Sequence, residues 1–222
     1  MTDTNIPRQF IPDKEMNDVH LDLGQGSLPL QTEVEAHGRA VAEICGVFAD
    51  VLGMPADLTN TIRIAGYLHD IGKYFVPKDI LLKPGPLSPL ERLMMERHVV
   101  HGVDRYLNLS RPGVDRLAHD TLVIMVIFQH HERFDGYGYP QGKKGRDVER
   151  MAQIVSIADV MSALCADRCY RNAFSFDAIL EHLEKEAGRA WKKDYVHYVF
   201  EHEERFRQVV TCKLFPDIDA NQ

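Results

Sequence analysis

Several features that mark particular protein classes are missing from this sequence. No apolar run approaches the roughly 20 residues that a membrane-spanning helix requires, which argues against a membrane span. The N-terminal stretch MTDTNIPRQFIPDKE lacks a basic region followed by an apolar one, so no signal peptide is expected. Together these absences predict a cytoplasmic protein.

Cysteine is scarce, and its arrangement excludes the common cysteine-based zinc sites. The four cysteines among 222 residues are scattered, and none forms a CxxC pair.

Positively charged residues are fewer than negatively charged ones, with 26 Lys and Arg against 33 Asp and Glu and a net charge of −7. A nucleic-acid polymer is therefore not an expected partner, because binding one requires clustered Lys and Arg. A phosphate-bearing ligand would need local cations or metal ions instead.

The distribution of apolar residues predicts an all-α fold. Residues 1–30 are rich in Asp, Gly, Pro and Gln without periodicity, which indicates a loosely structured N-terminal segment. Residues 31–222 form the predicted helical domain, since apolar residues there recur at intervals of three and four and nowhere alternate long enough to require a sheet. We expect a bundle of about seven helices, near 32–52, 57–68, 88 onward, 114–132, 150–166, 175–187 and 194–210.

Two loops and one helix start carry clear local signals. A proline-punctuated stretch covers about 77–89, and a glycine-rich turn region covers about 135–145. Ser88-Pro89-Leu90-Glu91 predicts an N-cap, a proline at the first helical position and a capping acid at the third. The helix after the first loop is therefore expected to begin directly after Ser88.

Imidazole and carboxylate groups occur at the ends of otherwise apolar helical stretches. His69-Asp70 follows one such stretch, and His130-His131-Glu132 closes another. Burying these groups costs free energy unless they are paired or bind a metal ion. Neighbouring helical residues project about 100° apart, so both members of a His-Asp pair can face one interior. From the residues alone, a hydrogen-bonded core pair explains His69-Asp70 equally well.

Other candidates are less distinctive when each is taken singly. Asp159 is a lone acid in an apolar helix, where a cap or salt bridge is the simpler explanation. Glu33 and His37 are spaced i,i+4 and share a helix face, as a surface pair also would. His98 and His101 share a helix, and spacing does not choose between them. Taken together, oxygen and imidazole donors without thiolates suit Mn(II), Fe(II), Ni(II) or Zn(II) in a multinuclear site, which favours phosphoester hydrolysis.

Three motifs resemble the successive signatures of the HD-GYP phosphodiesterases. They are His69-Asp70-Ile71-Gly72-Lys73, His130-His131-Glu132-Arg133 and Asp135-Gly136-Tyr137-Gly138-Tyr139-Pro140. The resemblance runs from about residue 33 to residue 174. The family shows a histidine followed four residues later by glycine, which selects His98, four residues before Gly102, over His101.

The resemblance implies an HD-domain helical bundle with a GYP loop, which is the glycine-rich region of about 135–145 that contains Gly138-Tyr139-Pro140. It also implies a site with two or three divalent metal ions, with Fe or Mn as the first candidates. Asp70 is the expected bridge and, with Lys73, the expected catalytic residue. Lys73 resembles the lysine that contacts the scissile phosphate, while Arg168 and Arg171 resemble cations that hold the distal phosphate or the guanine. The implied metal ligands are Glu33, His37, His69, Asp70, His98, His130, His131 and Asp159.

The implied reaction is hydrolysis of cyclic di-GMP to pGpG, with possible further cleavage to GMP. Two alternatives are open: a ligand-binding or partner-docking member without turnover, and a hydrolase of another nucleotide. Ser162 stands where the family commonly has Asp, and Cys169 where it commonly has Pro, so substrate preference is less fixed than reaction type. In the family, the GYP loop is associated with contacts to diguanylate cyclase (GGDEF) domains.

Overall fold

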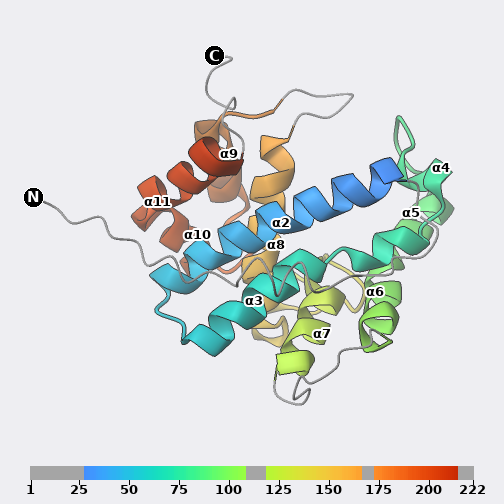
Figure 1. Cartoon of the computed structure of the whole chain (residues 1–222), viewed down its shortest axis with the longest axis horizontal. Helices are drawn as coiled ribbons and strands as arrows, with labels where there is room; N and C mark the ends of the chain where they lie inside the picture. The colour runs from blue at the N-terminus through green and yellow to red at the C-terminus, as the bar shows by residue number, and fades with distance from the viewer. Residues whose placement is uncertain (1–27, 109–118, 167–172, 215–222) are drawn as a thin grey trace, which may run out of the picture.

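The computed structural model describes residues 28–108, 119–166 and 173–214 (Figure 1). No strand occurs within these ranges and every regular element is helical, which confirms the predicted all-α class. Residues 1–27 of the expected loose segment lie outside the described residues, whereas residues 28–30 already belong to the first described helix. None of the described helices is long and apolar enough to cross a membrane.

The described residues form ten α-helices and three short η elements. In chain order they are α2 (Leu28–Val51), α3 (Ala56–Leu68), η1 (Ile71–Phe75), α4 (Lys78–Leu81), α5 (Pro89–Glu96), α6 (His98–Leu107), α7 (His119–Gln129), η2 (Gly145–Asp147), α8 (Arg150–Cys165), α9 (Phe176–Glu186), α10 (Lys193–Glu201), α11 (Glu203–Arg207) and η3 (Gln208–Leu214).

Two of the expected helices consist of shorter pieces. The helix expected from Ser88 is divided at Arg97 into α5 and α6. The helix expected over 194–210 is divided into α10, α11 and η3. The predicted capping box is confirmed, because Ser88 Oγ accepts from Glu91 N at 3.4 Å and a Glu91 carboxylate oxygen accepts from Ser88 N at 2.7 Å.

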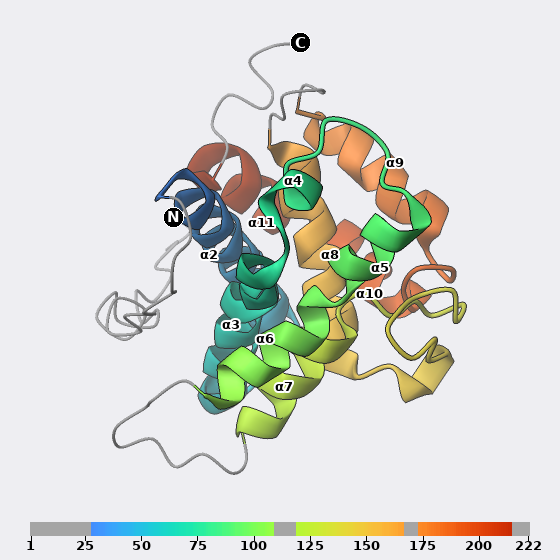
Figure 2. The ribbon, with the colours of Figure 1, turned by 90° about the vertical axis from the view of Figure 1, so that its right-hand side faces the viewer.

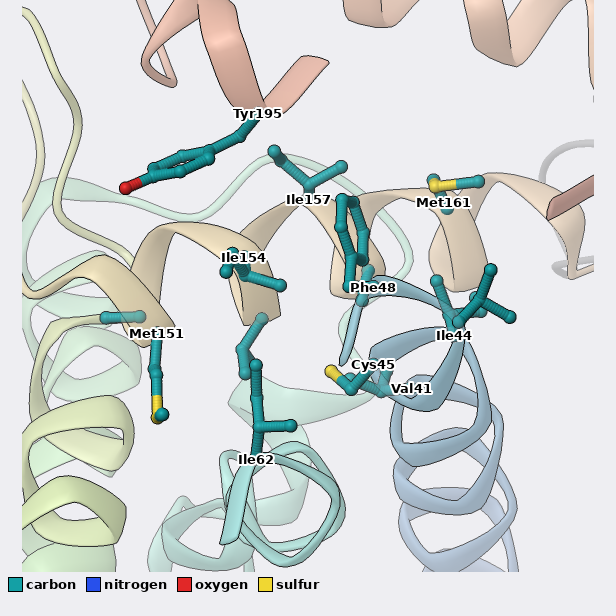
Figure 3. Packing of buried hydrophobic residues seen from close by; sticks show 14 of the residues in the cluster. Val41, Ile44, Cys45, Phe48, Ile62, Met151, Ile154, Ile157, Met161 and Tyr195 are labelled. Atoms are coloured by element: carbon teal, nitrogen blue, oxygen red, sulfur yellow. The ribbon is translucent and has the colours of Figure 1, made fainter. Parts of the chain in front are cut away.

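Helix α8 lies at the centre of the bundle. It contacts α2, α3, α7, α9 and α10, and Figure 2 shows it between the α2–α3 pair and α9. In Figure 3, Ile154, Ile157 and Met161 of α8 pack with Ile44 and Phe48 of α2, and all five side chains are fully buried. Each such side chain stabilises the fold by about 1.5–3 kcal/mol relative to exposure. Some polar residues of α8, such as Gln153 and Ser162, are therefore buried in the interior of the protein.

Candidate metal centre

Helix ends bring the principal candidate ligands together. His69 is the C-cap of α3, and Asp70 follows it as the N-cap of η1. His98 is the first residue of α6, and His130 comes directly after α7. These four residues are at most 2% exposed, so their polar atoms must find partners inside the protein.

A close approach of two backbones sets the distance between Asp70 and His98. A Cβ atom on Gly72 would overlap the carbonyl oxygen of His98 and the backbone nitrogen of Gly102, so α6 lies directly against η1. A Cβ atom on Gly102 would lie 2.8 Å from Ile127 Cγ2 on α7. The two glycines thus permit a contact that places His98 Nε2 3.3 Å from Asp70 Oδ1.

The two oxygens of the Asp70 carboxylate face different sets of histidines. Oδ1 lies 3.3 Å from His98 Nε2 and 3.7 Å from His130 Nε2. With His131, these residues form a group whose ligand atoms all lie within 4.8 Å of one another. Oδ2 instead lies 3.2 Å from His69 Nε2. One carboxylate therefore joins two potential metal sites.

The second group lies on the Oδ2 side of Asp70. His37, His69 and Asp70 have ligand atoms within 4.8 Å of one another. Asp159 Oδ1 closes this side, at 2.9 Å from His37 Nε2 and 3.7 Å from His69 Nε2. Glu33 lies one turn before His37, is exposed, and belongs to neither group. The structure thus brings together all the implied ligands except Glu33.

Backbone hydrogen bonds fix which ring nitrogen of three histidines faces the cluster. The Nδ1 atoms of His69, His98 and His130 lie 2.7, 2.8 and 3.0 Å from the carbonyl oxygens of Gly66, Met95 and Ile127. A carbonyl oxygen only accepts, so each Nδ1 carries a hydrogen, and Nε2 is the ring nitrogen that faces the cluster and can bind an ion.

The inward-facing atoms fit divalent metal ions. His98 Nε2 and His130 Nε2 are 3.4 Å apart, close enough for both to bind one ion. His69 Nε2 and Asp70 Oδ1 are buried and have no hydrogen-bond partner among the described residues. Two ligands bound at 2.0–2.2 Å to one ion lie roughly 3.0–3.5 Å apart, close to the 3.2 Å between His69 Nε2 and Asp70 Oδ2.

The environment keeps two of the histidines neutral and available. Burial lowers the pKa of His98 to about 4. Burial, followed by the proximity of His130 and His98, also holds the pKa of His131 well below its usual range. Neutral imidazole is the form that ligates a metal ion, so both rings are in the competent state at pH 7.

The carboxylates are ionised and attract positive charge. Burial opposes ionisation of Asp70, but Lys73 and His69 outweigh it and hold the pKa of Asp70 well below its usual range. For His69 burial favours the neutral ring, yet Asp70 and Asp159 together raise the pKa of His69 to about 10. The buried carboxylate of Asp70 and the partly buried one of Asp159 thus create a site that favours a cation.

A pocket of about 540 Å³ opens beside the His37 side of the cluster. Its polar lining includes Lys73, whose ammonium group pairs with Asp70 Oδ2, and Arg39. The volume falls within the range of small-molecule sites. Arg168 and Arg171, the implied ligand-binding cations, lie outside the described residues. Arg39 is a pocket cation that we did not predict, because it stands in no motif.

Ser162 supplies a hydrogen bond to the cluster. Its hydroxyl lies 3.0 Å from His37 Nδ1, while His37 Nε2 lies 2.9 Å from Asp159 Oδ1. A carboxylate only accepts, so the His37 ring donates from Nε2 to Asp159, and its Nδ1 is hydrogen-bonded to the Ser162 hydroxyl. The residue that departs from the family pattern therefore helps to orient His37.

Glu132 organises the GYP loop, a role that the sequence did not reveal. The Glu132 side chain is 1% exposed, and its two oxygens accept from the backbone nitrogens of Gln141 at 2.7 Å and Lys143 at 2.9 Å. A Cβ on Gly138 would overlap the backbone around His131 and Glu132, so the loop passes directly over the metal-cluster segment. The sequence signal that could have revealed this role is an acid next to two histidines, followed by a glycine-rich loop whose backbone amides need hydrogen-bond acceptors.

Comparisons with known proteins agree with this architecture. The HD domain family model matches residues 27–194. The chain is 35% identical over 174 residues to a 3′3′-cGAMP-specific phosphodiesterase of Vibrio cholerae, covering 78% of this chain and 32% of the relative. It is 32% identical over 189 residues to a cyclic di-GMP phosphodiesterase of Thermotoga maritima, covering 85% of this chain and 50% of the relative. The chain thus spans half or less of the length of these two relatives.

Two solved structures have the same fold. The HDG"Y"P protein Bd1817 of Bdellovibrio bacteriovorus superposes with a TM-score of 0.57 at 22% identity, covering 77% of this chain and 52% of that one. A cyclic GMP-AMP specific phosphodiesterase of Vibrio cholerae superposes with a TM-score of 0.54 at 14% identity, covering 81% of this chain and 49% of that one. The chain belongs to the HD domain family, and its motifs place it in the HD-GYP branch.

Proposed function

We propose that this chain is a metal-dependent phosphodiesterase that hydrolyses a cyclic dinucleotide, with cyclic di-GMP as the first candidate substrate. The observation that carries the proposal is the Asp70 carboxylate, whose two oxygens face two separate groups of imidazole nitrogens next to a pocket of about 540 Å³. Membership of the HD domain family and relatives named as cyclic dinucleotide phosphodiesterases support it.

The proposed ligands divide between two ions. Asp70 would be a ligand of both, with His98, His130 and His131 as the further ligands on the Oδ1 side and His69 with Asp159 on the Oδ2 side. His37 and Glu33 are proposed for a third ion, Glu33 by a side-chain movement, since it lies in neither present group. The donor set suits Fe(II) or Mn(II).

The reaction is the addition of water across one phosphodiester bond. The water oxygen bonds to phosphorus, the bond to the ribose 3′ oxygen breaks, and that oxygen takes up a proton, so cyclic di-GMP yields linear pGpG. Paired divalent ions, when bound, supply an activated water and neutralise charge on the attacking and leaving oxygens. Lys73 on the pocket wall stabilises the charge on the non-bridging phosphoryl oxygens. Arg168 and Arg171 are proposed to hold the other phosphate or a guanine.

The GYP loop is the proposed contact for a GGDEF domain. Tyr137 on this loop is 88% exposed, the most exposed of the large hydrophobic and aromatic side chains among the described residues. Tyrosine is among the residue types that are enriched at protein–protein interfaces. The ring faces away from the protein interior, so it does not compete with the contacts that hold the loop on the metal cluster.

Anaerobic incubation of Mn(II)- or Fe(II)-loaded protein with cyclic di-GMP, and in parallel with 3′3′-cGAMP, tests the proposal by chromatography of the products. We expect linear dinucleotide from the wild type and none from Asp70→Asn. Asp79→Asn, which changes an exposed acid of α4, is the matched control and should retain full turnover. Binding of either nucleotide without product would favour a sensor, and neither binding nor product would refute the assigned substrate class.

A further inference from the structure

His131 differs from the other histidines of the cluster in how its ring is held. The rings of His69, His98 and His130 each have Nδ1 on a carbonyl oxygen, and His37 has Nδ1 on Ser162 Oγ. In the part of the chain that the structure describes, no hydrogen bond of this kind reaches His131. A ligand whose ring is not oriented loses affinity for its ion, so another contact must set the orientation of His131.

Aromatic contacts surround the His131 ring. The Tyr139 ring is stacked on it, with centroids 4.6 Å apart and planes 26° apart. On other sides lie His130, with centroids 4.1 Å apart, and His98, at 5.1 Å and nearly perpendicular. His98 and His130 are themselves ligands, so Tyr139 is the partner from outside the proposed ligand set that fixes the plane of the His131 ring.

The backbone of the GYP loop places the Tyr139 ring. Tyr139 N donates to the carbonyl oxygen of His131 at 3.2 Å, which ties the two residues together directly. Gly138 allows the loop to approach the segment that carries His131, and Glu132 holds the far side of the loop through the Gln141 and Lys143 amides. The ring is therefore presented to His131 by a loop that is anchored on both sides.

We propose that Tyr139 is a positioning residue for His131, and that its ring, rather than its hydroxyl, sets the affinity of the ion that His131 binds. The inference rests on the metal centre of the proposed function. The Tyr139 ring orients His131 by aromatic stacking, whereas the other histidine ligands are oriented by a hydrogen bond at Nδ1. Removal of the ring should weaken one ion of the pair and leave the ion on the His69 side unchanged.

Mn(II) titration of metal-free protein by calorimetry tests this directly. Tyr139→Leu should weaken one binding step by about tenfold or more, and Tyr139→Phe should stay within about twofold of the wild type. Tyr137→Leu makes the same change on the same loop at an 88% exposed position and should have no effect. His131→Ala identifies the step, and the double variant Tyr139→Leu/His131→Ala should lose no more affinity than His131→Ala alone.

The possible results separate this inference from the function on which it rests. A wild type without Mn(II) or Fe(II) binding would overturn the metal centre itself. A wild type with two binding steps that Tyr139→Leu leaves intact would overturn only the role of Tyr139. Equal losses in Tyr139→Phe and Tyr139→Leu would assign the effect to the hydroxyl, and weakening of both steps together would show a general structural defect. Either of these last two outcomes also contradicts the proposal.

Discussion

Replacement of Glu132 by Gln measures how strongly the GYP loop is held against the metal cluster. The carboxylate is buried and accepts one hydrogen bond at each oxygen, from Gln141 N and Lys143 N. A glutamine side chain has the same shape and keeps one carbonyl oxygen that accepts a hydrogen bond from one of these amides. Its NH₂ group faces the other backbone N–H, and two donors cannot form a hydrogen bond. A hydrogen bond to a charged group contributes about 1.5–3 kcal/mol, so losing one and weakening the other should lower the free energy of unfolding by about 2–4 kcal/mol.

Urea unfolding followed by fluorescence provides the assay. Trp191, the single tryptophan, is 3% exposed, and its neighbour Ala190 accepts a hydrogen bond from Phe134 N at the base of the GYP loop. Glu184→Gln on α9 is the control, because Glu184 is exposed and should change stability by less than about 0.5 kcal/mol. A Glu132→Gln variant as stable as this control would refute the role of Glu132 as the anchor of the loop.

Three further predictions concern the loop and its surroundings. Gly138→Ala adds a Cβ that overlaps the His131 and Arg133 backbone. We expect the free energy of unfolding, measured with urea, to fall by about 1–3 kcal/mol and Mn(II) binding to weaken. An unchanged free energy of unfolding with unchanged Mn(II) affinity would contradict the close approach of the loop. Ser162→Ala removes the 3.0 Å contact with His37 Nδ1 and should lower the unfolding free energy by about 0.5–1.5 kcal/mol, whereas a stabilised variant would count against that contact. The Arg133 guanidinium lowers the pKa of Asp135 in the folded protein, so the ion pair stabilises the fold at pH values above the ordinary carboxyl pKa. This stabilisation is lost as the pH falls through the lowered pKa. Arg133→Lys should raise the pKa of Asp135 in an NMR titration, and an unchanged pKa would exclude the pairing.

The sequence predicted the fold class because helical periodicity and capping are local properties. The Ser88 capping box illustrates this, since four consecutive residues determine its hydrogen bonds. The division of the helices at Arg97 was missed, because the apolar pattern continues across that residue. Helix α6 begins at His98 and packs against η1, and this tertiary contact has no local signal in the sequence.

The candidate site depended more on the resemblance than on spacing. Residue chemistry alone did not decide between a metal site and a hydrogen-bonded core pair for His69-Asp70, and it did not choose between His98 and His101. The structure places His98 in the cluster and His101 against the Phe75 ring, with centroids 5.8 Å apart. That difference arises from the packing of two backbones at Gly72, which joins segments far apart in the sequence.

Residues that act through loop backbones were the hardest to predict. Glu132 binds amides nine and eleven residues later, and Tyr139 reaches His131 only because the loop folds back on itself. Neither contact has a periodic signature, since the intervening residues form no regular helix or strand. Arg168 and Arg171 stay predictions, because they lie outside the described residues.

Anomalous diffraction from crystals loaded with Mn(II) tests the central claim most directly, namely that Asp70 joins two metal ions. We predict two anomalous peaks about 3.5–4 Å apart, one on each side of the Asp70 carboxylate, with His98, His130 and His131 around one ion and His69 and Asp159 around the other. A single peak, or peaks that do not contact Asp70, would contradict the binuclear centre and the phosphodiesterase mechanism built on it.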